Sequence, residues 1–165
     1  MKLKLSLGIA MSVLSLASVA AQARPHHSHS RRQIAPVEAP ASAALRGLVA
    51  RTAAENHVPY GLANAVVTIE SRYNPRVANR SGALGLMQIK PQTARGLGFR
   101  GTAASLLDPD VNVRYGMAYL ALAYRQSGGD LCATVMRYES GIGATRMSAA
   151  NRAYCSRASA LMAHA

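Results

Sequence analysis

A stretch in the second half of the chain constrains the fold most, because apolar side chains cover nearly the whole helix that it predicts. The helix begins at Asp108-Pro109-Asp110, where proline suits the first turn and acidic groups face the positive end of the helix dipole. Gly128-Gly129 ends it. A helix that is apolar on most sides is typically central and buried, so other elements must surround it. Its apolar residues are Val111, Val113, Tyr115, Met117, Ala118, Leu120, Ala121 and Leu122.

The rest of the chain predicts further helices and no long strand. Ser42 and Asp130 each stand at the start of a helical pattern, where their side chains suit an N-cap, and a last, basic, Ala-rich helix begins at Ser148. Residues 84–89 are short, apolar and flanked by glycine, which fits either one helical turn or a small extended segment. We therefore expect a compact all-α domain with a cleft. The predicted helices cover residues 42–56, 59–73, 91–97, 110–127, 130–138 and 148 onward.

Glu70 is the most informative single residue for chemistry. It lies late in the second predicted helix and shares a side of that helix with Val66 and Val67. Burial beside aliphatic groups disfavours the charged carboxylate and raises its pKa. A carboxylic acid that holds its proton near neutral pH is what glycosidic bond cleavage requires. The alternative is a surface glutamate that pairs with Arg72 or Arg76.

The segment 85–89, which reads Gly-Leu-Met-Gln-Ile, offers polar and apolar groups to a ligand. Glycine lets backbone approach a ligand closely, and the Gln88 amide is suited to sugar hydroxyl and N-acetyl groups. Met87 would supply an adaptable apolar wall. Taken alone, the segment also fits an ordinary turn.

A third segment, 138–141, reads Tyr-Glu-Ser-Gly at the end of a predicted helix. The hydroxyl of Tyr138 is suited to donate to a nearby carboxylate and orient it. Glu139 is a second acidic candidate, although a helix end often carries such a group only for solvation. Tyr119 lies in the central helix, where a buried hydroxyl needs a partner.

Taken together and in the order in which they occur along the chain, these motifs resemble those of family 1 lytic transglycosylases, whose catalytic domain has a goose-lysozyme-like fold. The resemblance covers about Ala44 to Gly143. Arg137 and Glu139 depart from it, since the family usually has Ala and Asn there. The matching residues are Glu70-Ser71 (Glu-Ser), residues 85–89 (Gly-Leu-Met-Gln-Ile), Asn112, Gly116, Tyr119 and Leu120 (Asn-x-x-x-Gly-x-x-Tyr-Leu), and Tyr138 and Gly141 (Ala-Tyr-Asn-x-Gly).

The resemblance implies a lysozyme-like enzyme that cleaves the β-1,4 bond between N-acetylmuramic acid and N-acetylglucosamine in peptidoglycan and leaves 1,6-anhydromuramyl ends. Glu70 would act first as the acid and then as the base, with no metal or organic cofactor. Ser71 and Tyr138 would orient Glu70 or the substrate. The implied substrate-binding or orienting residues are Ser71, Met87, Gln88, Ile89, Tyr119, Tyr138 and Glu139.

Two other functions remain open at this point. A hydrolytic muramidase would use Glu139 as a base toward water, which requires a limited separation from Glu70. A non-catalytic protein would use its basic surface to stay bound to peptidoglycan. Small one-domain members of such a family either remodel the wall generally or open it locally for a secretion system or a flagellum.

Residues 1–23 have the pattern of an export signal. Lys2 and Lys4 precede an apolar core, and Ala21-Gln22-Ala23 fits a cleavage site with the cut after Ala23. An uncleaved membrane anchor is the alternative, although the apolar core is short for a span. We expect a periplasmic or secreted protein with no stable membrane span after cleavage.

Residues 24–41 predict a disordered, basic linker before a domain at 42–165, because they contain three prolines and few large apolar residues. Cleavage would lower the net charge from +12 to +10. For an exported protein, this charge favours an anionic cell wall or membrane surface, and we expect no nucleic acid partner. The linker histidines (His26, His27 and His29) fit a solvated tether better than a metal site.

The chain contains two cysteines, Cys132 and Cys155. In an oxidising compartment an isolated pair most simply forms one disulfide, which here would connect two late helices. Two free buried thiols are the alternative.

Overall fold

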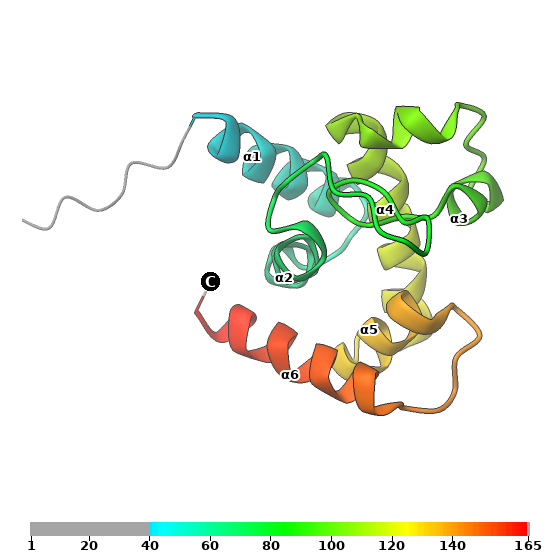
Figure 1. Cartoon of the computed structure of the whole chain (residues 1–165). Helices are drawn as coiled ribbons and strands as arrows, with labels where there is room; N and C mark the ends of the chain where they lie inside the picture. Colours follow the sequence, from blue (N-terminus) through cyan, green and yellow to red (C-terminus); the bar gives the residue numbers. More distant parts are fainter. Residues whose placement is uncertain (1–39, 165) are drawn as a thin grey trace, which may run out of the picture. The chain divides into compact units, whose positions relative to one another are not determined.

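The computed structural model describes residues 40–164, and within this range the chain is helical with no extended strand (Figure 1). The all-α prediction is confirmed. The predicted signal peptide (1–23) and nearly all of the predicted linker (24–41) lie outside the described residues. The elements are α1 (Pro40–Glu55), α2 (Tyr60–Ser71), α3 (Pro91–Gly96), the 3₁₀ helix η1 (Ala103–Leu107), α4 (Pro109–Gln126), α5 (Leu131–Ser140) and α6 (Ala149–Ala163).

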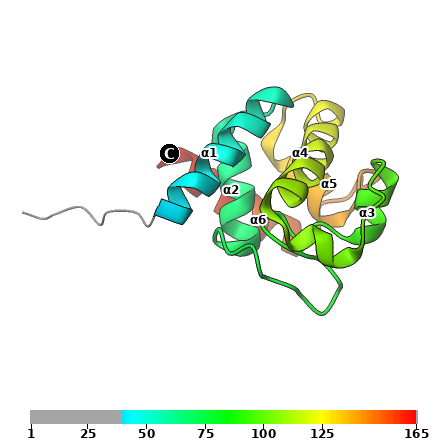
Figure 2. The ribbon, with the colours of Figure 1, turned by 90° about the horizontal axis from the view of Figure 1, so that it is seen from above.

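Helix α4 is the centre of the domain, as its apolar circumference predicted. It contacts α1, α3, α5 and η1, and Figure 2 shows it between the α1–α2 pair and α3. Val113, Met117 and Leu120 are fully buried in the main core. A smaller core with Phe99 and Leu106 packs against Tyr115 and its neighbours on α4. One helix therefore connects two hydrophobic clusters.

Side-chain caps define where the later helices begin. The Asp108 carboxylate accepts from the backbone N–H of Val111 at 3.0 Å, and Asp130 accepts from that of Ala133 at 2.7 Å. Ser148 and Asn151 form a reciprocal capping box at the start of α6. These bonds satisfy helix N–H groups that have no partner within their own helix.

The first two helices differ slightly from the prediction. Helix α1 begins at Pro40 rather than after Ser42, so Ser42 lies within the first turn. Proline is tolerated at the first helical position because its missing N–H is not needed there. Helix α2 ends at Ser71 rather than near Tyr73. Arg72 and Tyr73 have positive φ angles (51° and 63°), and this left-handed backbone turns the chain away from the helix axis.

The short segment at 84–89 is a tight turn whose two ends pair as an isolated antiparallel bridge. Leu84 and Ile89 exchange two backbone hydrogen bonds of 3.2 and 3.1 Å. Gly85 and Gln88 both have positive φ angles. The segment is therefore neither a helical turn nor an extended strand, because only its two ends pair and residues 85–88 form the turn between them.

A disulfide joins Cys132 of α5 to Cys155 of α6, with a Cα–Cα distance of 5.1 Å. The pairing prediction is confirmed. The bond fastens α6 to the body of the domain, which matters because α6 also reaches the cavity described below.

Replacing both cysteines by serine is expected to lower the free energy of unfolding by about 3 kcal/mol, because the bond closes a chain segment with a sequence separation of 23. Denaturant unfolding of the oxidised protein and the variant measures the difference. A variant with the same unfolding midpoint as the oxidised protein would contradict this role.

Candidate active site

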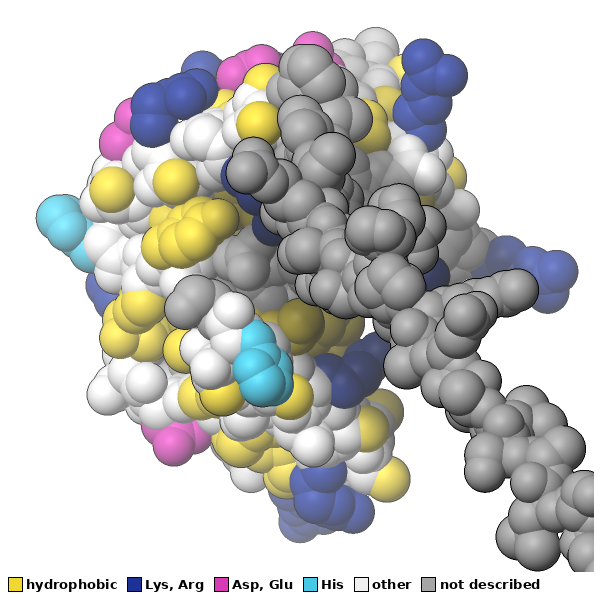
Figure 3. All heavy atoms as spheres, turned by 90° about the vertical axis from the view of Figure 1, so that its left-hand side faces the viewer, with side chains coloured by type: hydrophobic (Ala, Val, Ile, Leu, Met, Phe, Trp, Pro, Cys, Tyr) yellow, Lys and Arg dark blue, Asp and Glu magenta, His cyan; other side chains and the backbone are white. Residues whose placement is uncertain are grey.

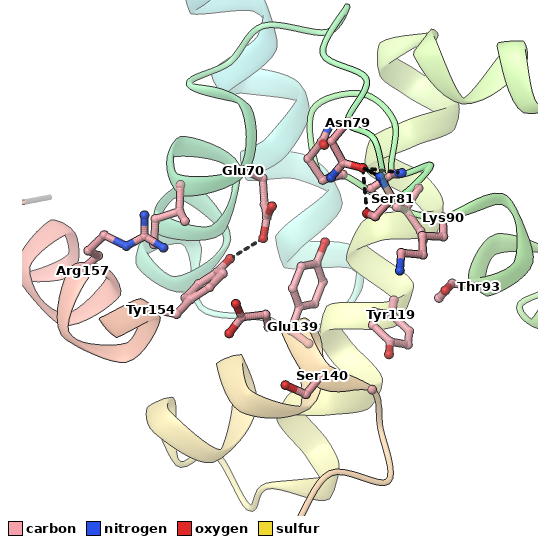
Figure 4. A pocket seen from close by; sticks show the side chains of 16 residues that line it. Glu70, Asn79, Ser81, Lys90, Thr93, Tyr119, Glu139, Ser140, Tyr154 and Arg157 are labelled. Carbon is pink, nitrogen blue, oxygen red and sulfur yellow. Dashed lines mark hydrogen bonds between the residues drawn. The ribbon is translucent and has the colours of Figure 1, made fainter. Parts of the chain in front are cut away.

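A cavity of about 520 Å³ opens between α2, α5, α6 and the loops before α3 (Figure 4). Its wall is mostly polar, with acidic, basic, hydroxyl and amide side chains converging from segments far apart in sequence. Its lining includes Glu70, Asn79, Ser81, Gln88, Ile89, Lys90, Thr93, Tyr119, Tyr138, Glu139, Ser140, Tyr154 and Arg157.

Glu70 is the penultimate residue of α2, and its side chain points into the cavity (Figure 4). Burial is the main cause that raises the pKa of the Glu70 carboxyl, and the nearby charge of Glu139 adds to it. A hydrogen bond from Tyr154 and the charge of Arg157 act in the opposite direction. The pKa remains raised, so Glu70 holds its proton closer to neutral pH than an ordinary glutamic acid does.

Tyr154 is the residue in direct contact with Glu70 that sequence reasoning missed. Its hydroxyl donates to Glu70 Oε1 at 2.8 Å, across 84 residues of sequence. Burial, followed by the nearby Glu70 charge, raises the pKa of Tyr154, so the hydroxyl keeps its proton as a donor. The sequence signal was the spacing of Asn151, Tyr154, Cys155 and Ala158, which are the residues of α6 that the structure buries.

Asn112 of α4 fastens the 84–89 loop beside the cavity. Its amide nitrogen donates to the carbonyls of Leu84 and Leu106 at 2.7 and 2.6 Å, and its oxygen accepts from the N–H of Met87 at 2.8 Å. The side chain is completely buried. A Cβ at Gly85 would collide with Asn112 and would lie 2.6 Å from the Leu106 carbonyl oxygen, so this contact requires glycine.

Ser71 and Tyr138 were expected to orient Glu70 or the substrate. In the structure their hydroxyl groups bind the backbone of the same loop and not Glu70. The Ser71 hydroxyl donates to the Leu86 carbonyl at 2.8 Å, and the Tyr138 hydroxyl donates to the Met87 carbonyl at 2.7 Å. Tyr138 also lines the cavity, whereas the buried Ser71 does not. Three helices thus each supply one side chain that fixes the loop backbone.

The other predicted binding residues divide into two groups. Ile89 and Tyr119 line the cavity. Gln88 also lines it, but its amide nitrogen donates to the carbonyls of Val77 and Gly85 within the loop. The Met87 side chain is fully buried and lies against Gly116 of α4, so it does not form a cavity wall.

Glu139 is exposed at the last turn of α5 and faces the cavity from the side opposite Glu70 (Figure 4). The amide nitrogen of Asn151 donates to Glu139 Oε2 at 2.7 Å. Two carboxyl groups therefore share one cavity, one sheltered and one open to water. Within residues 40–164, no cluster of three His, Cys, Asp or Glu side chains is placed to hold a metal ion.

Comparison with known proteins identifies the family. The family model for the transglycosylase SLT domain matches residues 47–158. The soluble lytic murein transglycosylase of Escherichia coli K12 is 33% identical over 116 residues, which covers 67% of this chain and 18% of that protein. The endo-type membrane-bound lytic murein transglycosylase A of Klebsiella pneumoniae is 43% identical over 68 residues, which covers 37% of this chain and 34% of that protein.

Solved structures agree on the fold. One match is the lytic transglycosylase Slt of Pseudomonas aeruginosa, solved as an inactive mutant with glutamine in place of one glutamate. The match covers 71% of this chain and 23% of the Slt chain, with a TM-score of 0.63 and 25% identity. The 70-kDa soluble lytic transglycosylase in complex with bulgecin A matches 68% of this chain and 18% of its own, with a TM-score of 0.54 and 28% identity.

Because the family model covers more than half of its residues, this chain belongs to the transglycosylase SLT domain family. The chain spans about a fifth of the length of the Escherichia coli relative.

Asn112→Leu is expected to lower the free energy of unfolding by at least about 3 kcal/mol, because it removes three hydrogen bonds and leaves the buried Leu106 carbonyl and Met87 N–H unpaired. Asn56→Leu is the matched control, since Asn56 bonds only within its own helix end, and should cost less than about 1 kcal/mol. Denaturant unfolding of both variants measures this. Equal losses would contradict the importance of the loop contact.

Tyr154→Phe is expected to raise the pKa of Glu70 further, because the lost hydrogen bond stabilised the carboxylate. The carboxyl carbon signal of Glu70, followed by NMR against pH in protein with ¹³C-labelled glutamate, measures this shift. A fall of the titration midpoint would show that the hydroxyl does not act on Glu70 as the geometry indicates.

Proposed function

We propose that this chain is an exported peptidoglycan lytic transglycosylase. It cleaves the β-1,4 bond between N-acetylmuramic acid and N-acetylglucosamine and leaves 1,6-anhydromuramyl ends. One observation carries the proposal: a sheltered Glu70 with a raised pKa faces a polar cavity in a member of the SLT domain family. The names of the relatives, which are lytic murein transglycosylases, support the same reaction.

Glu70 performs both proton transfers in this mechanism. The protonated carboxyl donates to the oxygen of the glycosidic bond as the bond to the anomeric carbon breaks. The resulting carboxylate accepts the proton of the muramyl 6-hydroxyl, whose oxygen forms the new bond to the same carbon. Glu70 ends protonated and ready for another cycle. One carboxyl suffices because the nucleophile belongs to the substrate, unlike schemes in which water completes the reaction.

The surrounding groups have separate tasks. Tyr154 keeps the Glu70 carboxyl oriented toward the cavity through its 2.8 Å hydrogen bond. The rigid 84–89 loop brings Gln88 and Ile89 to the wall, where they contact sugar. Tyr119 and Tyr138, whose rings lie 5.5 Å apart between centroids, offer an aromatic surface to a sugar face.

We place this activity in the periplasm or outside the cell, with peptidoglycan strands as the substrate. The signal pattern at residues 1–23 and the net charge of +12 support this location, since a basic protein is attracted to an anionic wall. Within residues 40–164, no helix has the length and apolar character needed to cross a membrane. A local role beside a secretion system or a flagellum is one form of this function, and general wall remodelling is the other.

Digestion of purified sacculi by the protein is expected to release muropeptides with anhydromuramyl ends, identified by mass spectrometry. Glu70→Gln should lower the rate by at least about a hundredfold, because the glutamine amide is too weak an acid to protonate the glycosidic oxygen. The control is Glu55→Gln, which removes an exposed glutamate of α1 outside the cavity and should keep the rate.

A stability measurement separates lost chemistry from lost folding. Since the folded pKa of Glu70 is raised, its contribution to stability falls as the pH rises through that pKa. Glu70→Gln should therefore gain stability relative to the unsubstituted protein as the pH increases.

Two other results of the digestion would contradict the proposal. Release of muropeptides with reducing muramyl ends would identify a hydrolytic muramidase. Retained wall binding with no release by either protein would identify a binding protein.

A further inference from the structure

We propose that Glu139, fixed in place by the buried amide of Asn151, is a positioning residue of the reaction centre whose negative charge helps keep the proton on Glu70 until the glycosidic oxygen takes it. This inference rests on the proposed function. It gives Glu139 an electrostatic task, with no bond to water or sugar required. Lytic transglycosylases usually have asparagine at the position that Glu139 matches, so Glu139 places a carboxyl group where an amide is usual.

The two carboxyl groups reach the cavity from different helices. Glu70 comes from the end of α2 and Glu139 from the end of α5, and Figure 4 shows the Glu139 carboxylate below that of Glu70 in the same cavity. Glu139 is exposed, whereas Glu70 is sheltered. When two carboxyl groups share a site, a negative charge on one opposes ionisation of the other.

Asn151 determines where the Glu139 charge stands. Its side chain is only 1% exposed, which is unusual for an amide. Its nitrogen donates to Glu139 Oε2 at 2.7 Å and to the Ser140 hydroxyl at 2.9 Å. Its oxygen accepts from the backbone and the hydroxyl of Ser148 at 3.0 and 2.9 Å. All its hydrogen-bonding groups are engaged, so the amide holds the carboxylate in a defined position.

The same helix therefore governs both carboxyl groups. Asn151 lies in the first turn of α6 and binds Glu139, and Tyr154 lies three residues later and binds Glu70. The two contacts oppose each other in effect. The Tyr154 hydroxyl favours the Glu70 carboxylate, whereas the Glu139 charge favours the neutral acid.

Other charged or ionisable groups also face the cavity and can affect the pKa of Glu70. Arg157 of α6 stabilises the Glu70 carboxylate and so lowers its pKa. Against this cation, Glu139 supplies the compensating negative charge. Without it, a cation and a hydroxyl donor would remain beside an acid that must hold its proton. The full set is Lys90 before α3, Tyr119 of α4, Tyr138 and Glu139 of α5, and Tyr154 and Arg157 of α6.

The test follows the Glu70 carboxyl directly, by NMR titration of the full chain labelled with ¹³C-glutamate. The sequence has only four glutamates (Glu38, Glu55, Glu70 and Glu139), and Glu70→Gln assigns the signal. Glu139→Gln removes the charge but keeps the length of the side chain. Glu139→Asn removes it with a shorter amide. Both should move the Glu70 titration midpoint to lower pH, and Glu55→Gln should leave it in place.

The rate on sacculi gives a second readout. The ratio of the alkaline rate to the acid rate should fall roughly two- to fivefold in Glu139→Gln, since this is the size of effect expected from one nearby charge. A midpoint that stays or rises in both Glu139 variants, with the fold retained, would overturn the inference. The NMR result stands even if the protein releases no muropeptides, so failure of the proposed function and failure of this inference are distinguishable.

Discussion

The side chain of Asn112 fastens the 84–89 loop to the central helix, and the cavity depends on that contact. Three hydrogen bonds of 2.6–2.8 Å engage two carbonyls and one N–H, and the buried Leu106 carbonyl and Met87 N–H depend on Asn112 for their partner. Ser71 and Tyr138 add one bond each from neighbouring helices. Side chains from three helices therefore fix the loop backbone, and Gln88 and Ile89 line the cavity from this fixed position.

Helix α6 completes the site from the far end of the sequence. It carries the donor to Glu70, the amide that fixes Glu139, and the cation Arg157. The Cys132–Cys155 disulfide connects this helix to α5, which carries Glu139 itself. The covalent bond thus holds α6, with Asn151 and Tyr154, close to the helix that carries Glu139. The tuning of one acid depends on helix packing as much as on its immediate neighbours.

Much of the fold was predictable because local signals agreed with each other. Asp108, Asp130 and Ser148 were expected at helix starts, and each caps its helix through a side-chain bond. The ends of α2 and the conformation of the 84–89 loop were less predictable. Left-handed residues such as Arg72 and Gln88 adopt their backbone angles because surrounding contacts require them, and residue type alone gives little indication.

The sequence by itself determined the helical class, the central helix, the cysteine pairing and the presence of an acid on a partly apolar helix face. Hydrophobic periodicity, helix caps and turn residues are local signals that span only a few positions, so they can be recognised in the sequence. The tertiary structure alone decided that Tyr154 binds Glu70, that Ser71 and Tyr138 hold a loop, and that Asn151 holds Glu139. These contacts join residues from 12 to 84 positions apart, and only packing of the helices around α4 brings such groups within hydrogen-bonding distance.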